Sequence, residues 1–373
     1  MNKSDLKFEF PEDLIAIEPQ RPSRICSTLL DSENNEQTTM LAQSNQALIN
    51  STPTNSAHTV YSAHPAQEVT WNEFLSFFQS GDVLVLNNTK VLKRRIWTKD
   101  GLEILFLEST DQCLWSVLFP AKRFKVGDQI QLPGEINLTL LEKGRPQKVK
   151  TSQVLSESYF DIYGELPLPP YIQKARDQRH TQDSDESWYQ TQWSEKPGSF
   201  AAPTASLHFT QEHLRQLKSR GVQICYLTLH VGLGTFLPVE VENLQEHIMH
   251  KEFVEISQSV LSEISKAQST NHRVWAMGTT VMRALESYGA GYLKQDVKNS
   301  VWIGNTDLLI LPGFQFKMVD RLLTNFHQPE STLLALVMAF AGIEKVKATY
   351  QWAINNKFKL FSYGDLSVWE RKR

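Results

Sequence analysis

The feature that most constrains the fold is a regular alternation of strand-like and helix-forming segments after residue 166. Apolar runs rich in Val, Ile and Leu predict buried strands over residues 222–230, 273–278 and 308–311. Helical periodicity and capping residues predict helices over residues 211–220, 257–266, 279–287, 331–342 and 345–356. Such alternation predicts mostly parallel strands joined by helical crossovers. Ligands of these folds bind beyond the carboxyl ends of the strands.

Residues 67–163 have a different pattern, with short strand-like runs separated by turn signals such as Pro133-Gly134. This spacing predicts a small antiparallel β-barrel domain. We therefore expect an α/β protein in which a discontinuous α/β domain, residues 1–66 and 164–373, carries the barrel as an insertion. Alternation alone allows the large domain to be barrel-like or an open three-layer sheet. Residues 31–66 are polar without apolar periodicity, and we expect a flexible insertion there.

Composition limits the possible partners and compartment. The formal net charge is −3, so nucleic acid would have to meet a local basic patch. The three cysteines are far apart and form no CxxC, which favours a reducing compartment without disulfides or a cysteine-based zinc site. The N-terminus lacks a signal-peptide pattern, and the longest apolar run, 333–341, is too short for a bilayer. We expect a cytoplasmic protein without membrane contact.

Polar residues follow the predicted strand ends. After residues 308–311 come Asn325, His327, Ser331 and Thr332, ahead of a helix that is apolar on every face. Ser331 or Thr332 can cap this helix, and its free N–H groups suit an anion or a polar ligand. The alternative is that these residues only cap the helix and tie down the loop.

Two further strand exits are rich in glycine and threonine. One contains His230, Gly232, Gly234 and Thr235, where the glycines would let backbone N–H groups approach a ligand. The dinucleotide fingerprint is incomplete there, so the stretch is weak as a cofactor motif.

The other exit runs from Gly278 to Glu286, where Thr279 or Thr280 would cap a helix. Arg283 and Glu286 lie three residues apart on one face of this helix, a spacing that allows them to pair with each other. No Walker, HExxH or GxSxG motif occurs in the sequence.

Residues 189–209 read as a binding loop between the domains, with Thr204 placed to cap the element that follows. His208 and His230 taken singly are more often structural than catalytic. Several histidines at strand exits without metal-ligand spacing favour acid–base work or recognition of a nucleobase.

Residues 87–126 contain eight Lys or Arg residues against four acids. They form either an ordinary solvated face or a contact surface for a phosphate backbone.

Nine stretches together resemble one family: 166–172, 189–198, 202–209, 229–236, 246–250, 278–283, 312–317, 324–334 and 361–365. The chain resembles the S-adenosylmethionine:tRNA ribosyltransferase-isomerases, which form epoxyqueuosine. The match is dense from Leu166 onwards, and in the first 160 residues Val85-Leu86-Asn87-Asn88-Thr89 is the clearest piece.

The resemblance implies a reaction between two substrates, S-adenosylmethionine and tRNA. The ribosyl part of S-adenosylmethionine moves to the aminomethyl group of a 7-deazaguanine at the wobble position and is isomerised, while adenine and methionine leave. S-adenosylmethionine is then a co-substrate, and neither a cofactor nor a metal is expected. The reaction needs a base beside the sulfonium, an acid for the departing adenine, and a pocket for the extruded nucleotide.

Residue roles follow from the resemblance as hypotheses. The acid–base candidates are His208, His230 and His327, and Arg283 is the candidate for the methionine carboxylate. The remaining substrate-binding candidates are Thr204, Gly232, Gly234, Thr235, Asn325, Ser331 and Thr332. Lys93 and Arg94 are the candidate tRNA contacts, and we expect a monomer.

The sequence departs from the family pattern at Thr28 and Lys90, which bear on tRNA binding, and at Ser206 and Lys251. A non-catalytic tRNA- or nucleotide-binding protein with the same fold is the alternative function. A methyltransferase is a third possibility, but the glycine-rich first strand turn of that class is missing.

Overall fold

The computed structural model describes residues 1–29, 65–232, 234 and 239–372. All but the last two residues of the predicted insertion at 31–66 lie outside this range. The described residues form two compact units. The large unit draws on residues 1–88, 203–229 and 237–373, and the small unit on residues 89–202 and 230–236.

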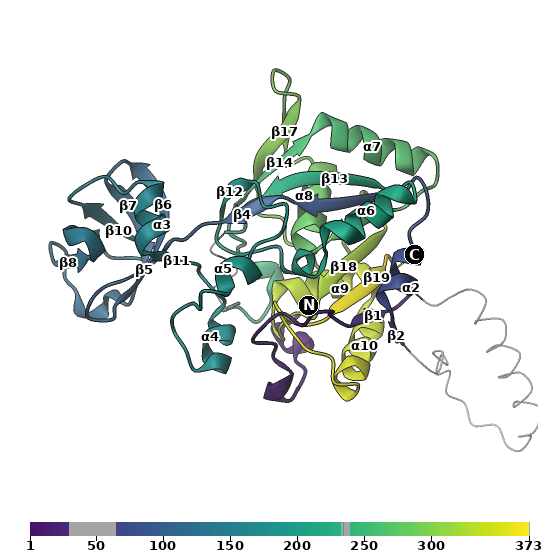
Figure 1. The fold of residues 1–373 in the computed structure, drawn as a ribbon, viewed down its shortest axis with the longest axis horizontal. Helices are drawn as coiled ribbons and strands as arrows, with labels where there is room; N and C mark the ends of the chain where they lie inside the picture. Colours follow the sequence, from purple (N-terminus) through teal and green to yellow (C-terminus); the bar gives the residue numbers. More distant parts are fainter. Residues whose placement is uncertain (30–64, 233, 235–238, 373) are drawn as a thin grey trace, which may run out of the picture. The chain divides into compact units, whose positions relative to one another are not determined.

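The large unit is built on a ten-stranded mixed sheet (Figure 1). In spatial order its strands are β16 (Lys294–Asp296), β17 (Val301–Thr306), β14 (Glu252–Ser257), β13 (Gln223–Leu229), β3 (Val83–Asn87), β15 (Val274–Met277), β18 (Arg321–Asn325), β19 (Leu366–Glu370), β1 (Ile25–Ser27) and β2 (Gln67–Val69). The four central strands β13, β3, β15 and β18 run parallel. Both β3 and β15 are buried at every position, as expected for central parallel strands covered on both faces.

Helices of the large unit follow the predicted alternation. They are α2 (Trp71–Ser76), α6 (Gln211–Ser219), α7 (Gln258–Ser269), α8 (Thr279–Gly289), α9 (Thr332–Ala341) and α10 (Ile343–Asn355), with 3-10 turns η1 (Lys3–Leu6), η2 (Glu12–Leu14), η5 (Thr204–His208) and η7 (Leu244–Glu246). Both α7 and α8 pack against the central strands β3, β13 and β15. Helix α9 is buried along most of its length, because its residues are apolar on every face.

The small unit contains a seven-stranded antiparallel sheet. Its strands in spatial order are β11 (Gly164–Glu165), β5 (Arg95–Trp97), β6 (Glu103–Asp111), β7 (Leu114–Leu118), β10 (Gln147–Thr151), β9 (Ile136–Glu142) and β8 (Gln129–Leu132). Alternate residues of these strands form an apolar core with Tyr159 and Phe160 of α3 (Glu157–Tyr163). The Tyr159 hydroxyl donates to the carbonyl of Pro133, 3.1 Å away, so α3 lies against the β8 edge.

The small unit also contains the parallel pair β4 (Thr89–Val91) and β12 (Lys196–Ser199). Short helices α4 (Pro170–Arg176) and α5 (Asp185–Trp188) and the 3-10 turns η3 (Ala121–Arg123) and η4 (Pro133–Glu135) complete it. The structure therefore shows a mixed α/β protein with a smaller antiparallel unit.

Two predictions differ from the structure. The predicted boundary at residue 67 assigns β2, α2 and β3 to the small domain, but β2 and β3 are strands of the large sheet. The fully buried β3 pairs with β13 and β15, which no local pattern reveals. The predicted strand at 308–311 is wrong, because this stretch is buried at Leu308 and Ile310 but is not a strand.

Candidate active site

The carboxyl ends of the four parallel strands meet at one edge of the large sheet. Asn87 ends β3, and its side-chain amide exchanges two hydrogen bonds with the backbone of Leu229 at the end of β13, at 2.9 and 3.1 Å. The Asn88 carboxamide oxygen accepts from the Thr228 hydroxyl at 2.7 Å. These side chains fix the ends of β3 and β13 against each other. Such an edge is where ligands bind in open α/β sheets.

A chain of polar side chains lies at the end of β18. The Thr204 hydroxyl donates to Asn325 Oδ1 at 2.7 Å, and Asn325 Nδ2 lies 3.2 Å from His208 Nε2. Asn325 Nδ2 also donates to the carbonyl of Gly364 at 3.1 Å. The structure thus brings together three of the predicted site residues. Thr204 acts differently from the prediction, because Pro203 holds the N-cap position of η5 and the Thr204 hydroxyl is directed to Asn325.

His327 lies two residues beyond β18 and is half-buried. Its Nε2 is 2.9 Å from the Thr324 hydroxyl, and its backbone N–H donates to the Tyr350 hydroxyl at 2.9 Å. Burial lowers the pKa of His327 to about 3 and that of His208 to about 4. Both imidazoles are therefore neutral at physiological pH, so each can accept a proton and donate one only after it has been protonated.

The lowered pKa of His208 predicts an acid-sensitive fold. Unfolding restores an ordinary pKa of about 6.5. Between pH 6.5 and pH 4 the unfolded chain therefore binds a proton at His208 that the folded protein does not bind. Stability is present above pH 6.5 and is lost as pH falls towards 4. The unfolding free energy of the wild type falls between pH 7 and pH 4.5. We expect this fall to be smaller by about 2–3 kcal/mol in His208→Gln. Urea denaturation at both pH values measures this difference. The exposed His250→Gln should keep the wild-type loss, and an equal loss in His208→Gln would contradict the prediction.

Helix α8 begins at the same edge, directly after β15. Gly278 occupies its N-cap position with φ +89°, a left-handed conformation that favours glycine, and no side chain caps the helix. The prediction that Thr279 or Thr280 caps α8 is therefore wrong. The Thr280 hydroxyl instead lies 3.5 Å from Asn87 Nδ2. The first N–H groups of an eleven-residue helix thus have no side-chain cap at the edge where the strands end.

Arg283 lies one turn into α8 and is buried, with 6% of its surface exposed. Its Nη1 donates to Glu252 of β14, and its Nε donates to the carbonyl of Leu308 at 3.3 Å. Within the described residues its Nη2 has no hydrogen-bond partner. The considered pairing with Glu286 does not occur, because the Glu286 carboxylate accepts three backbone N–H groups from residues 317–319.

Ser331 caps α9, as one of the two predicted alternatives. Its hydroxyl accepts from the N–H of Leu334 at 3.2 Å and donates to the carbonyl of Gln328 at 2.7 Å. Thr332 is the first residue of the helix. Two local contacts therefore hold the Ser331 hydroxyl.

The glycine-rich exit after β13 belongs to the small unit. His230 Nδ1 lies 2.7 Å from the Thr89 hydroxyl. The His230 ring lies so close to Gly198 that a Cβ there would come within 2.6 Å of it. Gly232 and Gly234 are half-buried, and Thr235 lies outside the described residues. His230 thus belongs to the small unit, whereas His208 and His327 belong to the large unit.

The two predicted tRNA contacts form ion pairs within the small unit. Lys93 pairs with Glu186, and Arg94 pairs with Glu157. The Arg94 guanidinium is buried 4.2 Å from the centre of the Phe160 ring. The structure therefore corrects the prediction for Arg94, which is packed against the core of the small unit and is not presented to solvent.

We expect Arg94→Gln to lower the melting temperature without weakening tRNA binding. The change removes a buried guanidinium, its ion pair with the exposed Glu157 and a cation–π contact, with an expected loss of about 2 kcal/mol of unfolding free energy. Thermal denaturation and tRNA affinity at two salt concentrations measure the two effects. A lower salt slope with unchanged stability would return Arg94 to the surface contacts.

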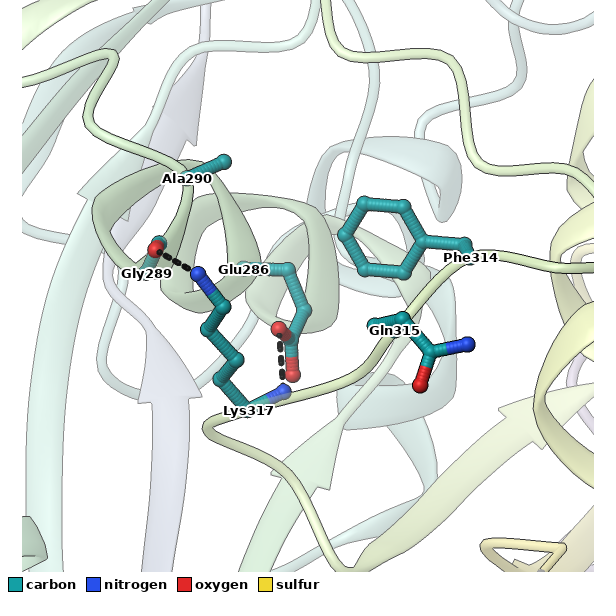
Figure 2. A pocket seen from close by; sticks show the side chains of 6 residues that line it. All are labelled: Glu286, Gly289, Ala290, Phe314, Gln315 and Lys317. Atoms are coloured by element: carbon teal, nitrogen blue, oxygen red, sulfur yellow. Dashed lines mark hydrogen bonds between the residues drawn. The ribbon is translucent and has the colours of Figure 1, made fainter.

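A pocket of about 200 Å³ lies at the other end of α8, about 15 Å along the helix by its rise per residue. It is lined by Glu286, Gly289, Ala290, Phe314, Gln315 and Lys317 (Figure 2). The Lys317 ammonium donates to the carbonyl of Gly289 at 3.1 Å, and the Glu286 carboxylate accepts from the backbone N–H groups of residues 317–319. The charged groups of Glu286 and Lys317 in this pocket are thus bonded to the backbone near the end of α8. The site at the carboxyl ends of the strands is therefore the better candidate active site.

Sequence reasoning missed Asn87 and Thr280 as members of the site. The available signal was a polar residue directly after a fully apolar strand, which Asn87 and Asn88 both satisfy. Among the described residues, no group of three or more His, Cys, Asp or Glu side chains is placed to hold a metal ion. No helix in the same residues has the length and apolarity needed to cross a bilayer.

Comparison with known proteins identifies the family of this chain. A family model described as queuosine biosynthesis protein matches residues 3–368. The S-adenosylmethionine:tRNA ribosyltransferase-isomerase of Halothermothrix orenii is 42% identical over 311 residues, which cover 80% of this chain and 87% of that protein. The crystal structure of S-adenosylmethionine tRNA ribosyltransferase from Thermotoga maritima matches with a TM-score of 0.50 and 26% identity, over 98% of this chain and 99% of that one. The resemblance noted in the sequence is confirmed, and this chain belongs to the family of queuosine biosynthesis proteins.

Proposed function

We propose that this chain is an S-adenosylmethionine:tRNA ribosyltransferase-isomerase. It transfers the ribosyl part of S-adenosylmethionine to 7-aminomethyl-7-deazaguanine at the tRNA wobble position and isomerises it, giving epoxyqueuosine-tRNA, adenine and methionine. The site observation that carries this proposal is the joint presence of neutral His208 and His327 and the uncapped start of α8 at one sheet edge. The 42% identity to the Halothermothrix orenii enzyme supports the same reaction.

Each part of the edge suits one requirement of the reaction. A neutral imidazole can take the proton beside the sulfonium, and the imidazolium formed in that step can then give a proton to the departing adenine. His327 is the more exposed of the two and suits direct contact with substrate, while His208 is held within the Thr204–Asn325 chain. His230 remains an acid–base candidate supplied by the small unit.

The methionine carboxylate requires donors that are not already engaged. Arg283 Nη2 is buried without a partner among the described residues, and a carboxylate is the acceptor to which it would donate most favourably. The first N–H groups of α8 are a second anion-binding feature one turn earlier on the same helix. Gly232, Gly234, Thr235, Ser331 and Thr332 remain proposed substrate contacts.

We propose that S-adenosylmethionine serves as a co-substrate and that the cytoplasmic enzyme works as a monomer without metal or bound cofactor. The small antiparallel unit is proposed to be a small β-barrel. The apolar core on one face of its seven-stranded sheet supports this arrangement.

The deciding experiment is mass spectrometry of the wobble nucleoside after incubation with S-adenosylmethionine and tRNA carrying the aminomethyl-deazaguanine. We expect an epoxycyclopentanediol adduct and release of one adenine per modified tRNA. Unmodified tRNA that still binds the protein would support the binding-only alternative. A methylated product would support a methyltransferase.

A further inference from the structure

Two loops of the small unit are joined side by side. Residues 119–128 and 141–148 form what we call the basic loop pair. The Gln147 side chain accepts from the N–H of Phe119 at 3.3 Å and donates to its carbonyl at 3.2 Å. The N–H of Gly127 donates to the carbonyl of Leu140 at 2.8 Å, just before the second loop. These hydrogen bonds hold the two loops together as one surface, although the loops are separated in the sequence.

The basic loop pair has a charge opposite to that of the whole chain. Its 18 residues contain six exposed cations, Lys122, Arg123, Lys125, Lys143, Arg145 and Lys148, against the two acids Asp128 and Glu142. Six minus two gives a local charge of +4, whereas the full chain carries −3. The remaining 355 residues therefore carry −7, so this surface is a marked exception.

Most of these cations are available to a ligand. Lys148 pairs with Glu142 at 2.9 Å, and Arg123 lies 3.7 Å from the Asp100 carboxylate. Among the described residues the charged groups of Lys122, Lys125, Lys143 and Arg145 form no ion pair. The Asp128 carboxylate is engaged by the backbone N–H of Lys125 at 2.8 Å. Four cations thus face solvent without a carboxylate partner.

Exposed apolar side chains lie among these cations. Val126 is 62% exposed and Leu141 is 42% exposed, and the Gly127–Leu140 hydrogen bond places them close together. Phe124 lies next to them in the first loop, with the Arg123 guanidinium 5.1 Å from its ring centre. Cations surrounding apolar groups match the surface of a folded RNA, where phosphates alternate with sugars and base faces.

We propose that the basic loop pair is a docking surface for tRNA, where its cations contact backbone phosphates and Val126 and Leu141 contact sugars or unstacked bases. This inference rests on the proposed function, which supplies a polyanionic substrate. The observations favour RNA over an anionic lipid surface because Val126 and Leu141 are the two exposed large apolar side chains of these loops, too few to insert into a bilayer as an amphipathic helix does.

The test compares a triple variant, Lys125→Ala with Lys143→Ala and Arg145→Ala, with wild-type protein. Neutralising three phosphate contacts should raise the Kd for tRNA about tenfold or more at 0.15 M salt and reduce the salt slope by about three. The KM for tRNA should rise in parallel, while kcat at saturating tRNA stays within about twofold because none of the three residues belongs to the proposed site. The matched control replaces the exposed Lys218, Lys266 and Lys294 of the large unit by alanine and should keep the wild-type salt slope.

The outcomes separate this inference from the proposed function. An unchanged Kd and salt slope in the triple variant, with the melting temperature of the wild type, would overturn the docking surface even if wild-type protein modifies tRNA. Loss of binding to anionic vesicles with unchanged tRNA affinity would also overturn it, in favour of lipid. Failure of wild-type protein to release adenine would refute the proposed function, and the binding comparison would still decide whether the loops contact tRNA.

Discussion

Replacing His327 by alanine is expected to lower kcat by about 10²- to 10⁴-fold, the usual contribution of a positioned acid or base. Burial lowers the pKa of His327 to about 3, so its imidazole is neutral at physiological pH and can accept a proton from the substrate. The ring nitrogen is fixed 2.9 Å from the Thr324 hydroxyl, and the backbone N–H is fixed by Tyr350. Adenine release in a single turnover measures the loss directly, and the melting temperature shows whether the fold is intact.

Two variants test whether the loss arises from the imidazole itself. Thr324→Val removes the hydroxyl partner but keeps the ring, so we expect a smaller loss, of about tenfold. His180→Ala changes an exposed histidine of the small unit and should leave kcat unchanged. Near-normal adenine release by His327→Ala would remove His327 from the acid–base candidates and leave His208 and His230.

The local sequence predicts the elements of the large unit better than their pairing. Segments with clear periodicity and caps, such as α7, α9 and β15, lie within a few residues of the predicted ranges. The run at 308–311 is apolar because Leu308 and Ile310 fill the core, and burial alone does not distinguish a strand from a packed loop. The local pattern assigns strand β3 to the small domain with the strands that follow it. This assignment is wrong because its partners β13 and β15 lie more than 130 residues away in the sequence.

The candidate site shows the same limit. Asn325 lies at the end of β18 and contacts Thr204 and His208, which the sequence places in a loop between the domains and not at a strand end. The partner of a buried charge could not be predicted, because Arg283 of α8 and Glu252 of β14 are 31 residues apart and meet only in the folded large unit. The local excess of cations predicts Arg94 as a phosphate contact, but Arg94 lies buried just before β5, where it pairs with Glu157 and contacts the Phe160 ring. Exposure, which the sequence does not give, decides between these two roles.

Replacing Arg283 by methionine is expected to destabilise the protein by about 3–5 kcal/mol, because it removes one partner of a buried ion pair. The same variant should raise the KM for S-adenosylmethionine by about 10- to 100-fold, the value of a charge-assisted hydrogen bond to the methionine carboxylate. Urea denaturation measures the first effect, and initial rates of adenine release at varied S-adenosylmethionine measure the second. Each effect alone has a simpler explanation, so the single variant does not distinguish support of the fold from contact with substrate.

A double variant, Arg283→Met with Glu252→Gln, separates the two roles. Neutralising Glu252 removes the buried carboxylate that the single variant leaves without its guanidinium, so most of the lost stability should return. The KM for S-adenosylmethionine should stay high, because no cation then remains at the position of Arg283 Nη2. Glu252→Gln alone keeps the guanidinium and should bind S-adenosylmethionine at least as well as wild type, since a competing carboxylate is gone. If the double variant recovers both stability and KM, the role of Arg283 is only to pair with Glu252 of β14, and the carboxylate must bind at the uncapped start of α8.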